Sequence, residues 1–117
     1  TLSGGLVVLW FLFRGIGTIL LVPLVEELFF RDYLEGRLRG APADGPAPLM
    51  RVIAAALITA GLFALLHDRW AEAFLAGLVF SVVARRQGRI SDAIAAHAAA
   101  NAVVFAAAVA TGNLAII

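Results

Sequence analysis

Ionisable and amide side chains occur in three short motifs of an otherwise apolar chain. The motifs are Glu26-Glu27-Leu28-Phe29-Phe30-Arg31, Phe63-Ala64-Leu65-Leu66-His67 and His97-Ala98-Ala99-Ala100-Asn101. A glutamate shielded from bulk solvent can accept a proton from a water molecule, and a histidine can orient that water or move the proton. A second histidine and an amide can donate hydrogen bonds to a developing oxyanion. These residue types suit a hydrolase that activates water without a covalent intermediate.

Helical spacing predicts how the motif residues face one another. Glu27 and Arg31 stand four residues apart and can pair on one face of a helix. Glu26 is rotated by about 100° from Glu27, so the two carboxylates cannot share Arg31 equally. His97 and Asn101 are also four residues apart and are expected to point at one target.

Two further residues are expected to shape the site. Phe63 lies one turn before His67 and is expected to shield the imidazole ring from lipid. Pro23 lacks an N–H group, which frees the backbone carbonyl of Ile19 and predicts a kink just before the acidic pair.

Each polar residue also has a purely structural interpretation. Glu27 and Arg31 can form a structural ion pair, and a single histidine or Asn101 can hydrogen-bond one helix to another. The serines Ser3, Ser81 and Ser91 lie outside any nucleophile-elbow motif. The ordered combination of carboxylates, histidines and amide is harder to explain as packing than any one of its members.

Composition places these motifs in a membrane. The 117 residues are 62% hydrophobic and 15% charged, with a mean hydropathy of +0.97, whereas soluble domains are about 45–50% apolar and about 25% charged. The net charge of +1 gives no basic field for nucleic acid. The chain has neither lysine nor cysteine, which excludes Schiff-base chemistry, disulfides, thiolate zinc sites and cysteine nucleophiles.

Four apolar blocks predict an all-α, polytopic transmembrane bundle of about four helices with the active site in the membrane. A spanning helix needs about 20 mostly apolar residues, so the second and third blocks must borrow flanking positions. The blocks are Thr1–Val25, Val52–Leu66, Ala73–Ala84 and Ala93–Ile117. We interpret residues 1–117 as one domain, and as a fragment or the catalytic core of a longer chain.

Arginines in the connections predict the orientation of the bundle. Residues 40–48 form a Gly/Pro-rich loop flanked by arginines, and residues 85–89 contain three more, whereas residues 67–70 contain one. By the positive-inside rule the first and third connections are cytoplasmic and both chain ends lie outside.

In this arrangement the polar side chains are expected at different depths in the membrane. A first helix from about Arg14 to Arg39 puts Glu26 roughly 20 Å from its inner end, while His67 lies roughly 24 Å and Asn101 roughly 18 Å from theirs. They converge only if helices tilt or break. Residues 1–13 would then form an interfacial segment or the tail of another helix.

The three motifs, in this order, resemble the CPBP family, which includes the type II CAAX prenyl endopeptidases and is also called the ABI domain. The motifs Glu26-Glu27-x-x-x-Arg31, Phe63-x-x-x-His67 and His97-x-x-x-Asn101 span about two-thirds of the chain. The resemblance implies an intramembrane glutamic-type protease that cleaves a membrane-associated protein or peptide. Members usually carry further transmembrane helices before the first motif.

The resemblance also implies roles for individual residues. Glu26 would be the general base with His67 as its partner, and His97 with Asn101 would form the oxyanion site. Glu27 and Arg31 would support the glutamate. No cofactor is implied, and the alanine- and arginine-rich composition favours a bacterial cytoplasmic membrane as the location.

Other functions remain open at this point. Glu26, His67 and His97 could ligate a catalytic zinc ion, although no His-Glu-x-x-His motif occurs. The polar cluster could instead bind a peptide in a non-enzymatic immunity or scaffold protein. A proton-coupled transporter would require inverted repeats or paired broken helices, which the sequence does not show.

Overall fold

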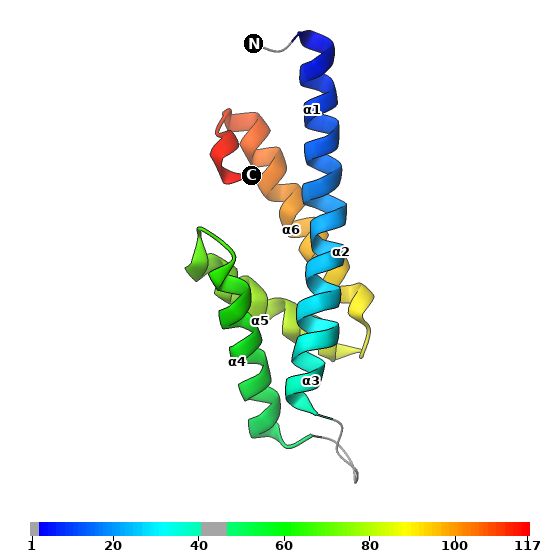
Figure 1. The fold of residues 1–117 in the computed structure, drawn as a ribbon, viewed down its shortest axis with the longest axis vertical. Coiled ribbons are helices and arrows are strands. Elements are labelled where there is room, and N and C mark those ends of the chain that lie inside the picture. The colour runs from blue at the N-terminus through cyan, green and yellow to red at the C-terminus, as the bar shows by residue number, and fades with distance from the viewer. Residues whose placement is uncertain (1–2, 41–46) are drawn as a thin grey trace.

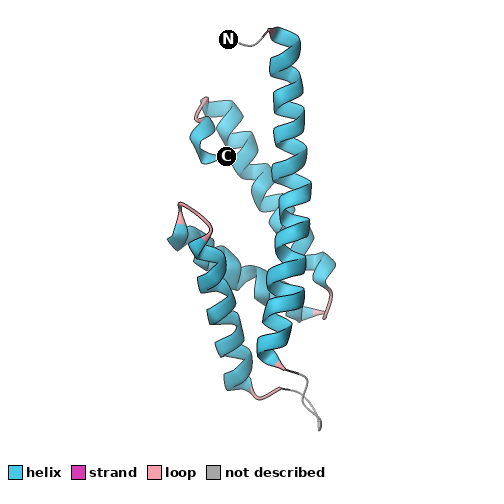
Figure 2. Cartoon of the chain, viewed as in Figure 1, coloured by secondary structure: helices cyan, strands magenta, loops and turns pink. Residues whose placement is uncertain are grey.

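The computed structural model describes residues 3–40 and 47–117, which fold into four helices and a short C-terminal turn (Figure 1). The helices are a continuous one over Gly4–Arg39, α4 (Leu49–Leu65), α5 (Trp70–Arg86) and α6 (Ile90–Thr111), and the turn is the 3₁₀ segment η3 (Leu114–Ile116). Within the described ranges no strand occurs (Figure 2). The predicted all-α bundle of about four helices is therefore confirmed.

The first helix changes its hydrogen-bond register twice along its length. It consists of α1 (Gly4–Ile16), the π-helical η1 (Gly17–Leu21), α2 (Val22–Glu27), the π-helical η2 (Leu28–Glu35) and α3 (Gly36–Arg39). Its 36 residues extend over about 54 Å at 1.5 Å per residue. We call it the long helix.

Helix lengths agree with the expectation that two segments span a membrane alone and two are short. The long helix and the 22-residue α6 are long and apolar enough to cross the hydrocarbon core, which is about 30 Å thick. Helices α4 and α5 have 17 residues each, or about 26 Å. If these two helices also cross the membrane, flanking residues or local thinning of the bilayer must complete their spans.

The expected helix start near Arg14, with residues 1–13 forming a separate segment, is wrong. The helix already begins at Gly4, where the Ser3 hydroxyl accepts a hydrogen bond from the Leu6 N–H at 3.4 Å. The charge of Arg14 does not end the helix because its side chain is exposed and donates to the Ile117 carbonyl.

Pro23 affects a different carbonyl from the one expected. The preceding turn is π-helical, with the Val22 N–H bonded to the Gly17 carbonyl five residues back. In this register the N–H that Pro23 lacks would have bonded to Thr18, so the Thr18 carbonyl is left free rather than that of Ile19. The π-helical turn accommodates the proline ring within a continuous helix.

The helices pack through small side chains and leave large ones outside. In Figure 1, α4 runs beside the α2–α3 half of the long helix, α5 crosses at an angle, and α6 packs against η1 and α2. Ala55, Ala60, Ala93 and Ala108 are at most 1% exposed, which lets the backbones approach closely. The large exposed side chains include Leu12, Phe13, Leu57, Leu65 and Val82.

The predicted loop over residues 40–48 lies mostly outside the described residues. Gly40 ends α3 with a positive φ of +77°, and α4 begins at Leu49 after Pro48. Residues 41–46 are not described.

Candidate active site

The centre of the polar cluster is Glu27, whose side chain is fully buried at the end of α2. Its Oε1 atom accepts a hydrogen bond from Arg31 Nη1 at 3.2 Å and lies 2.6 Å from His97 Nδ1. Arg31 is in η2 and His97 is in the middle of α6. The predicted Glu27–Arg31 pair is confirmed, and the carboxylate also connects the long helix to α6.

Glu26 faces a different set of partners from its neighbour. Its Oε2 atom lies 3.9 Å from His67 Nε2 and 3.7 Å from His97 Nε2. That oxygen is buried and has no hydrogen-bond partner among the described residues. As the 100° rotation predicts, the two adjacent carboxylates do not share the arginine.

Hydrogen bonds fix the neutral tautomer of both imidazole rings. His67 Nδ1 lies 2.8 Å from the backbone carbonyl of Phe63, which can only accept, so Nδ1 carries the proton. His97 Nδ1 donates in the same way to the Glu27 carboxylate. In the neutral rings both Nε2 atoms are therefore unprotonated, and both face Glu26.

Aromatic rings contact the two histidines. The Phe63 ring lies 4.4 Å from the His67 ring between centroids, so the predicted contact between the two side chains is present. Phe80, in α5, stacks on His97 with the centroids 4.5 Å apart and the planes at 17°. Nothing in the sequence identifies Phe80, because its neighbours form an ordinary apolar helix.

Asn101 binds a different target from His97. Its Nδ2 atom donates to the Thr18 carbonyl at 2.8 Å, the group that Pro23 leaves without a backbone donor. The expectation that Asn101 and His97 point at one target is therefore wrong for these hydrogen bonds. Both side chains still line one cavity, and Nδ2 has a second hydrogen that this bond does not use.

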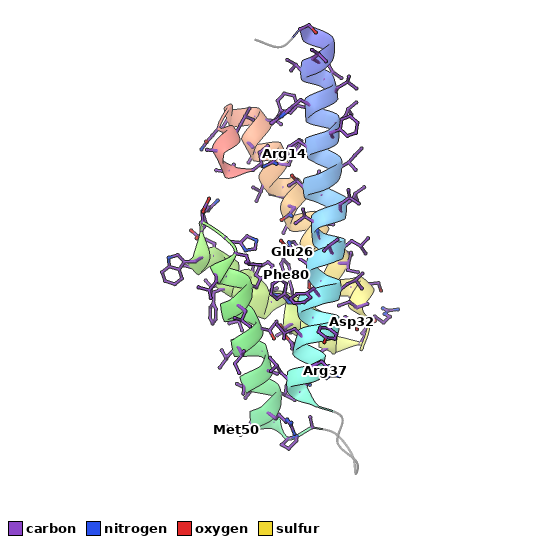
Figure 3. All side chains as sticks on the ribbon, in the orientation of Figure 1. Arg14, Glu26, Asp32, Arg37, Met50 and Phe80 are labelled. Carbon is purple, nitrogen blue, oxygen red and sulfur yellow. The ribbon has the colours of Figure 1, made fainter. Side chains whose placement is uncertain are left out.

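A cavity of about 460 Å³ adjoins the cluster at the α4–α5 turn. His67, His97 and Asn101 line it together with apolar and charged residues of α4, α5, α6 and η3. Figure 3 shows Glu26 and Phe80 at a similar height, between the long helix and the α4–α5 pair. The polar motifs therefore converge, with Glu26 and Glu27 of the long helix close to His67 at the end of α4 and to His97 of α6.

A second buried carboxylate lies beyond the predicted site. Glu35 is 1% exposed, accepts from the Ser81 hydroxyl at 2.5 Å, and pairs with Arg39 at 3.3 Å. The signal was present in the sequence: Glu27, Arg31, Glu35 and Arg39 follow one another at four-residue intervals on one helix face. Glu35 lies beyond the motif that ends at Arg31 and is therefore not among the predicted site residues.

The described residues contain no group of three or more metal-ligating side chains in metal-binding geometry. Glu26, His67 and His97 come nearest, with oxygen-to-nitrogen distances of 3.7 and 3.9 Å. The ligand atoms around a tetrahedral zinc ion lie about 3.3–3.5 Å from one another, because each zinc–ligand bond is about 2.0–2.1 Å long. The three groups are therefore spaced slightly more widely than zinc ligands.

Fold and site together define a class of proteins: a helical bundle with an apolar exterior and a carboxylate–histidine cluster buried between its helices. Comparison with family models identifies the particular family. The model described as type II CAAX prenyl endopeptidase Rce1-like matches residues 8–103, a range that contains all three motifs. The chain belongs to this family of membrane-embedded proteases.

Comparison with curated proteins gave no match, and comparison with solved structures gave none either.

Proposed function

We propose that the protein is an intramembrane endopeptidase that hydrolyses a peptide bond of a membrane-associated or lipidated protein with glutamate-activated water. The observation that carries the proposal is the Glu26 carboxylate, which faces the Nε2 atoms of His67 and His97 and has a buried oxygen without a partner among the described residues. We infer that no cofactor is needed, and that the protein acts in a bacterial cytoplasmic membrane.

The separations around Glu26 suit a bridging water molecule. Contacts of 3.7 and 3.9 Å are too long for direct hydrogen bonds but short enough for one water to contact the carboxylate and a ring nitrogen. In the proposed reaction Glu26 removes a proton from this water as its oxygen attacks the scissile carbonyl carbon. His67 accepts a hydrogen bond from the water and orients it.

The remaining groups would act on the tetrahedral intermediate. Glu27 holds the His97 ring through Nδ1, and when His97 is protonated at Nε2 this N–H would donate to the oxyanion. The second Nδ2 hydrogen of Asn101 would be the other donor. Protonated Glu26 then returns its proton to the leaving amide nitrogen, the C–N bond breaks, and the carboxylate is regenerated.

Arg31 would hold the Glu27 side chain in place. Its guanidinium bonds to Glu27 and lies 4.5 Å from the centroid of the Phe63 ring. We assign Arg31 and Phe63 positioning roles, because neither contacts the reacting atoms in this scheme.

The proposal is tested by comparing the full-length parent protein with its Glu26→Gln variant at equal expression in the native host. Membrane-protein N-termini and C-termini are profiled by mass spectrometry. Termini that depend on Glu26 are expected, and they would also reveal the substrate. The Asp92→Asn variant is the matched control, because Asp92 pairs with Arg89 at 3.5 Å, away from the cluster.

Identical terminal profiles for the parent and Glu26→Gln, under conditions in which the protein is required, would contradict hydrolysis. If Glu26→Gln also retained full biological activity, the cluster would be a binding site of a non-enzymatic immunity or scaffold protein.

Zinc-dependent hydrolysis is the second candidate. Both histidines donate through Nδ1 to a carboxylate or a carbonyl, an arrangement that also orients zinc-bound histidines. A chelator separates the mechanisms: cleavage that persists in purified protein treated with 1,10-phenanthroline supports the glutamate mechanism. Loss of cleavage that zinc restores would support the metal.

A further inference from the structure

Glu35 is a buried carboxylate that the proposed reaction does not use. It lies about two turns after Glu27 on the long helix and is 1% exposed. Its two oxygens have different partners: Oε1 accepts from the Ser81 hydroxyl at 2.5 Å, and Oε2 pairs with Arg39 at 3.3 Å. Burial of a carboxylate is costly unless its partners compensate, so these two contacts must account for its place inside the bundle.

The contact with Arg39 lies on the solvent side of the carboxylate. The Arg39 side chain is 29% exposed and lines a smaller cavity of about 230 Å³ at the α5–α6 connection. Both partners belong to the long helix, four residues apart. A partly exposed pair of this kind contributes little to stability, and it does not connect the long helix to any other helix.

The contact with Ser81, in contrast, joins the long helix to α5. Ser81 is 2% exposed, and an oxygen–oxygen distance of 2.5 Å is typical of a hydroxyl that donates to a carboxylate. The Ser81 oxygen also lies 3.1 Å from the Gly77 carbonyl, but a hydroxyl has one hydrogen, and the shorter contact identifies Glu35 as its acceptor. Within the described part of the chain, no other side chain of α5 hydrogen-bonds to another helix.

A directional bond of this kind restrains the rotation of α5 about its own axis. Phe80 and Ser81 are neighbours on the buried side of α5, where Phe80 stacks on His97 of α6 and Ser81 bonds to Glu35. Apolar side chains gain little in lipid by facing another helix, so hydrogen bonds and close packing orient the helices. A rotation of α5 that breaks the Ser81 bond would therefore also move the Phe80 ring away from His97.

We propose that Glu35 and Ser81 are positioning residues, which orient His97 by holding Phe80 against its ring. This role rests on the proposed function, in which His97 acts on the tetrahedral intermediate. Phe80 covers one face of the imidazole at 4.5 Å with the planes 17° apart. The contact restrains the ring in the plane in which Nδ1 meets Glu27. Glu35 and Ser81 act through Phe80, because neither contacts the reacting atoms.

The test records the ring-proton NMR signals of isotopically labelled histidine in the full-length protein in detergent. The face of Phe80 shields the His97 ring protons, so a Phe80→Leu variant gives the unstacked position of the His97 signals. Ser81→Ala and Glu35→Leu should each move these signals at least half of the way to that position. The double variant should move them no further than the larger single effect, because both changes break the same bond.

Two control variants and an internal reference separate this role from general stability of the bundle. Arg39→Gln removes the ion pair but keeps the Ser81 bond, and Glu35→Gln keeps an oxygen that accepts from Ser81. Both should leave the His97 signals near their parental positions. The His67 signals are the internal reference, because this ring contacts a phenylalanine of α4 rather than one of α5, and they should not move.

Two NMR outcomes would overturn the proposal. The first is a set of His97 signals that stay at the parental position in both Ser81→Ala and Glu35→Leu. The second is equal movement of the His67 and His97 signals, which would assign the Glu35–Ser81 bond to the stability of the whole bundle.

Cleavage kinetics give a second readout, with a substrate identified by the terminal profiles. Ser81→Ala should lower kcat by about tenfold and leave KM nearly unchanged, because a misplacement of about 1 Å can cost about 10²-fold in rate. Arg39→Gln should keep the parental kcat. A displaced His97 ring with unchanged kcat would overturn the role in the reaction. A parent protein that cleaves nothing would contradict the proposed function, whereas the NMR comparison would still decide whether Glu35 and Ser81 position His97.

Discussion

At the residue scale, two adjacent glutamates occupy different environments because of helical rotation. Glu27 is buried and bonded to Arg31 and His97, whereas Glu26 faces two imidazole nitrogens without a hydrogen bond from the described residues. One carboxylate is committed to holding the site together, and the other is free for chemistry. This separation underlies the roles that we propose for them.

Replacement of Arg31 by leucine is expected to destabilise the protein strongly. The variant leaves the Glu27 carboxylate buried without its cation, and removal of one partner of a buried ion pair costs about 3–5 kcal/mol. Thermal unfolding of the purified protein measures the effect. Arg37→Leu is the control, since Arg37 is an exposed arginine on the same helix; equal Tm values for the two variants would contradict the interpretation.

At the element scale, helix α5 approaches the long helix closely at Gly77. A Cβ at this position would lie 2.7 Å from Arg31 Nη2 and 3.4 Å from the Cα of Ala60 in α4. A glycine here lets three helices meet around the guanidinium that holds Glu27. Helix packing and the geometry of the site are therefore coupled at this residue.

Gly77→Ala is consequently expected to lower stability despite the better helix propensity of alanine. Overpacking typically costs about 1–3 kcal/mol, against a propensity gain of about 1 kcal/mol. Gly61→Ala, in α4, is the matched control, because its Cβ would meet nothing within 4 Å and should raise stability slightly. Denaturation of both variants in the same detergent gives the comparison, and a Gly77→Ala protein as stable as Gly61→Ala would refute the close approach.

The contact between α6 and the π-helical turn η1 depends on Pro23 and Asn101 together. Pro23 removes a backbone donor, and the Asn101 amide replaces it at the Thr18 carbonyl. In a Pro23→Ala background the Thr18 carbonyl regains a backbone donor in either helical register. Removal of the Asn101 amide should then cost less stability.

A double-mutant cycle is expected to show this coupling. Asn101→Ala should cost less stability in the Pro23→Ala background than in the parent, with an interaction energy of roughly 0.5–3 kcal/mol. Thermal unfolding provides the four stabilities. Additive effects would show that Asn101 does not serve the freed carbonyl, whereas activity that remains lost in the double variant would support its proposed oxyanion role.

At the scale of the whole molecule, the two cavities lie toward opposite ends of the bundle. The larger one is at the α4–α5 turn and η3, and the smaller one is at the α5–α6 connection. Arginines of the connections lie near the smaller cavity, and Arg39 and Arg85 both line it. This distribution predicts which end faces the cytoplasm.

Single-cysteine labelling tests the orientation, because the chain contains no cysteine. In intact cells that express the full-length protein, a membrane-impermeant maleimide should label Asn113→Cys, beside η3. It should label Gln87→Cys, in the α5–α6 connection, only after the membrane is permeabilised. The reverse pattern would contradict the orientation predicted from the arginines.

The sequence alone predicted the helical class, the membrane-protein family and the three motifs whose side chains meet in the candidate site. Apolar blocks and the four-residue spacing of Glu27–Arg31 and Phe63–His67 are local properties, so they could be recognised without coordinates. The tertiary structure decided what depends on packing between distant segments: the bond from Glu27 to His97, the stacking of Phe80 on His97, and the diversion of Asn101 to Thr18. The hydrogen-bond register of the long helix could not be predicted either, because a π-helical turn before Pro23 shifts the free carbonyl from Ile19 to Thr18. Periodicity determines which face of a helix is polar, but the contacts of that face depend on how the helices cross.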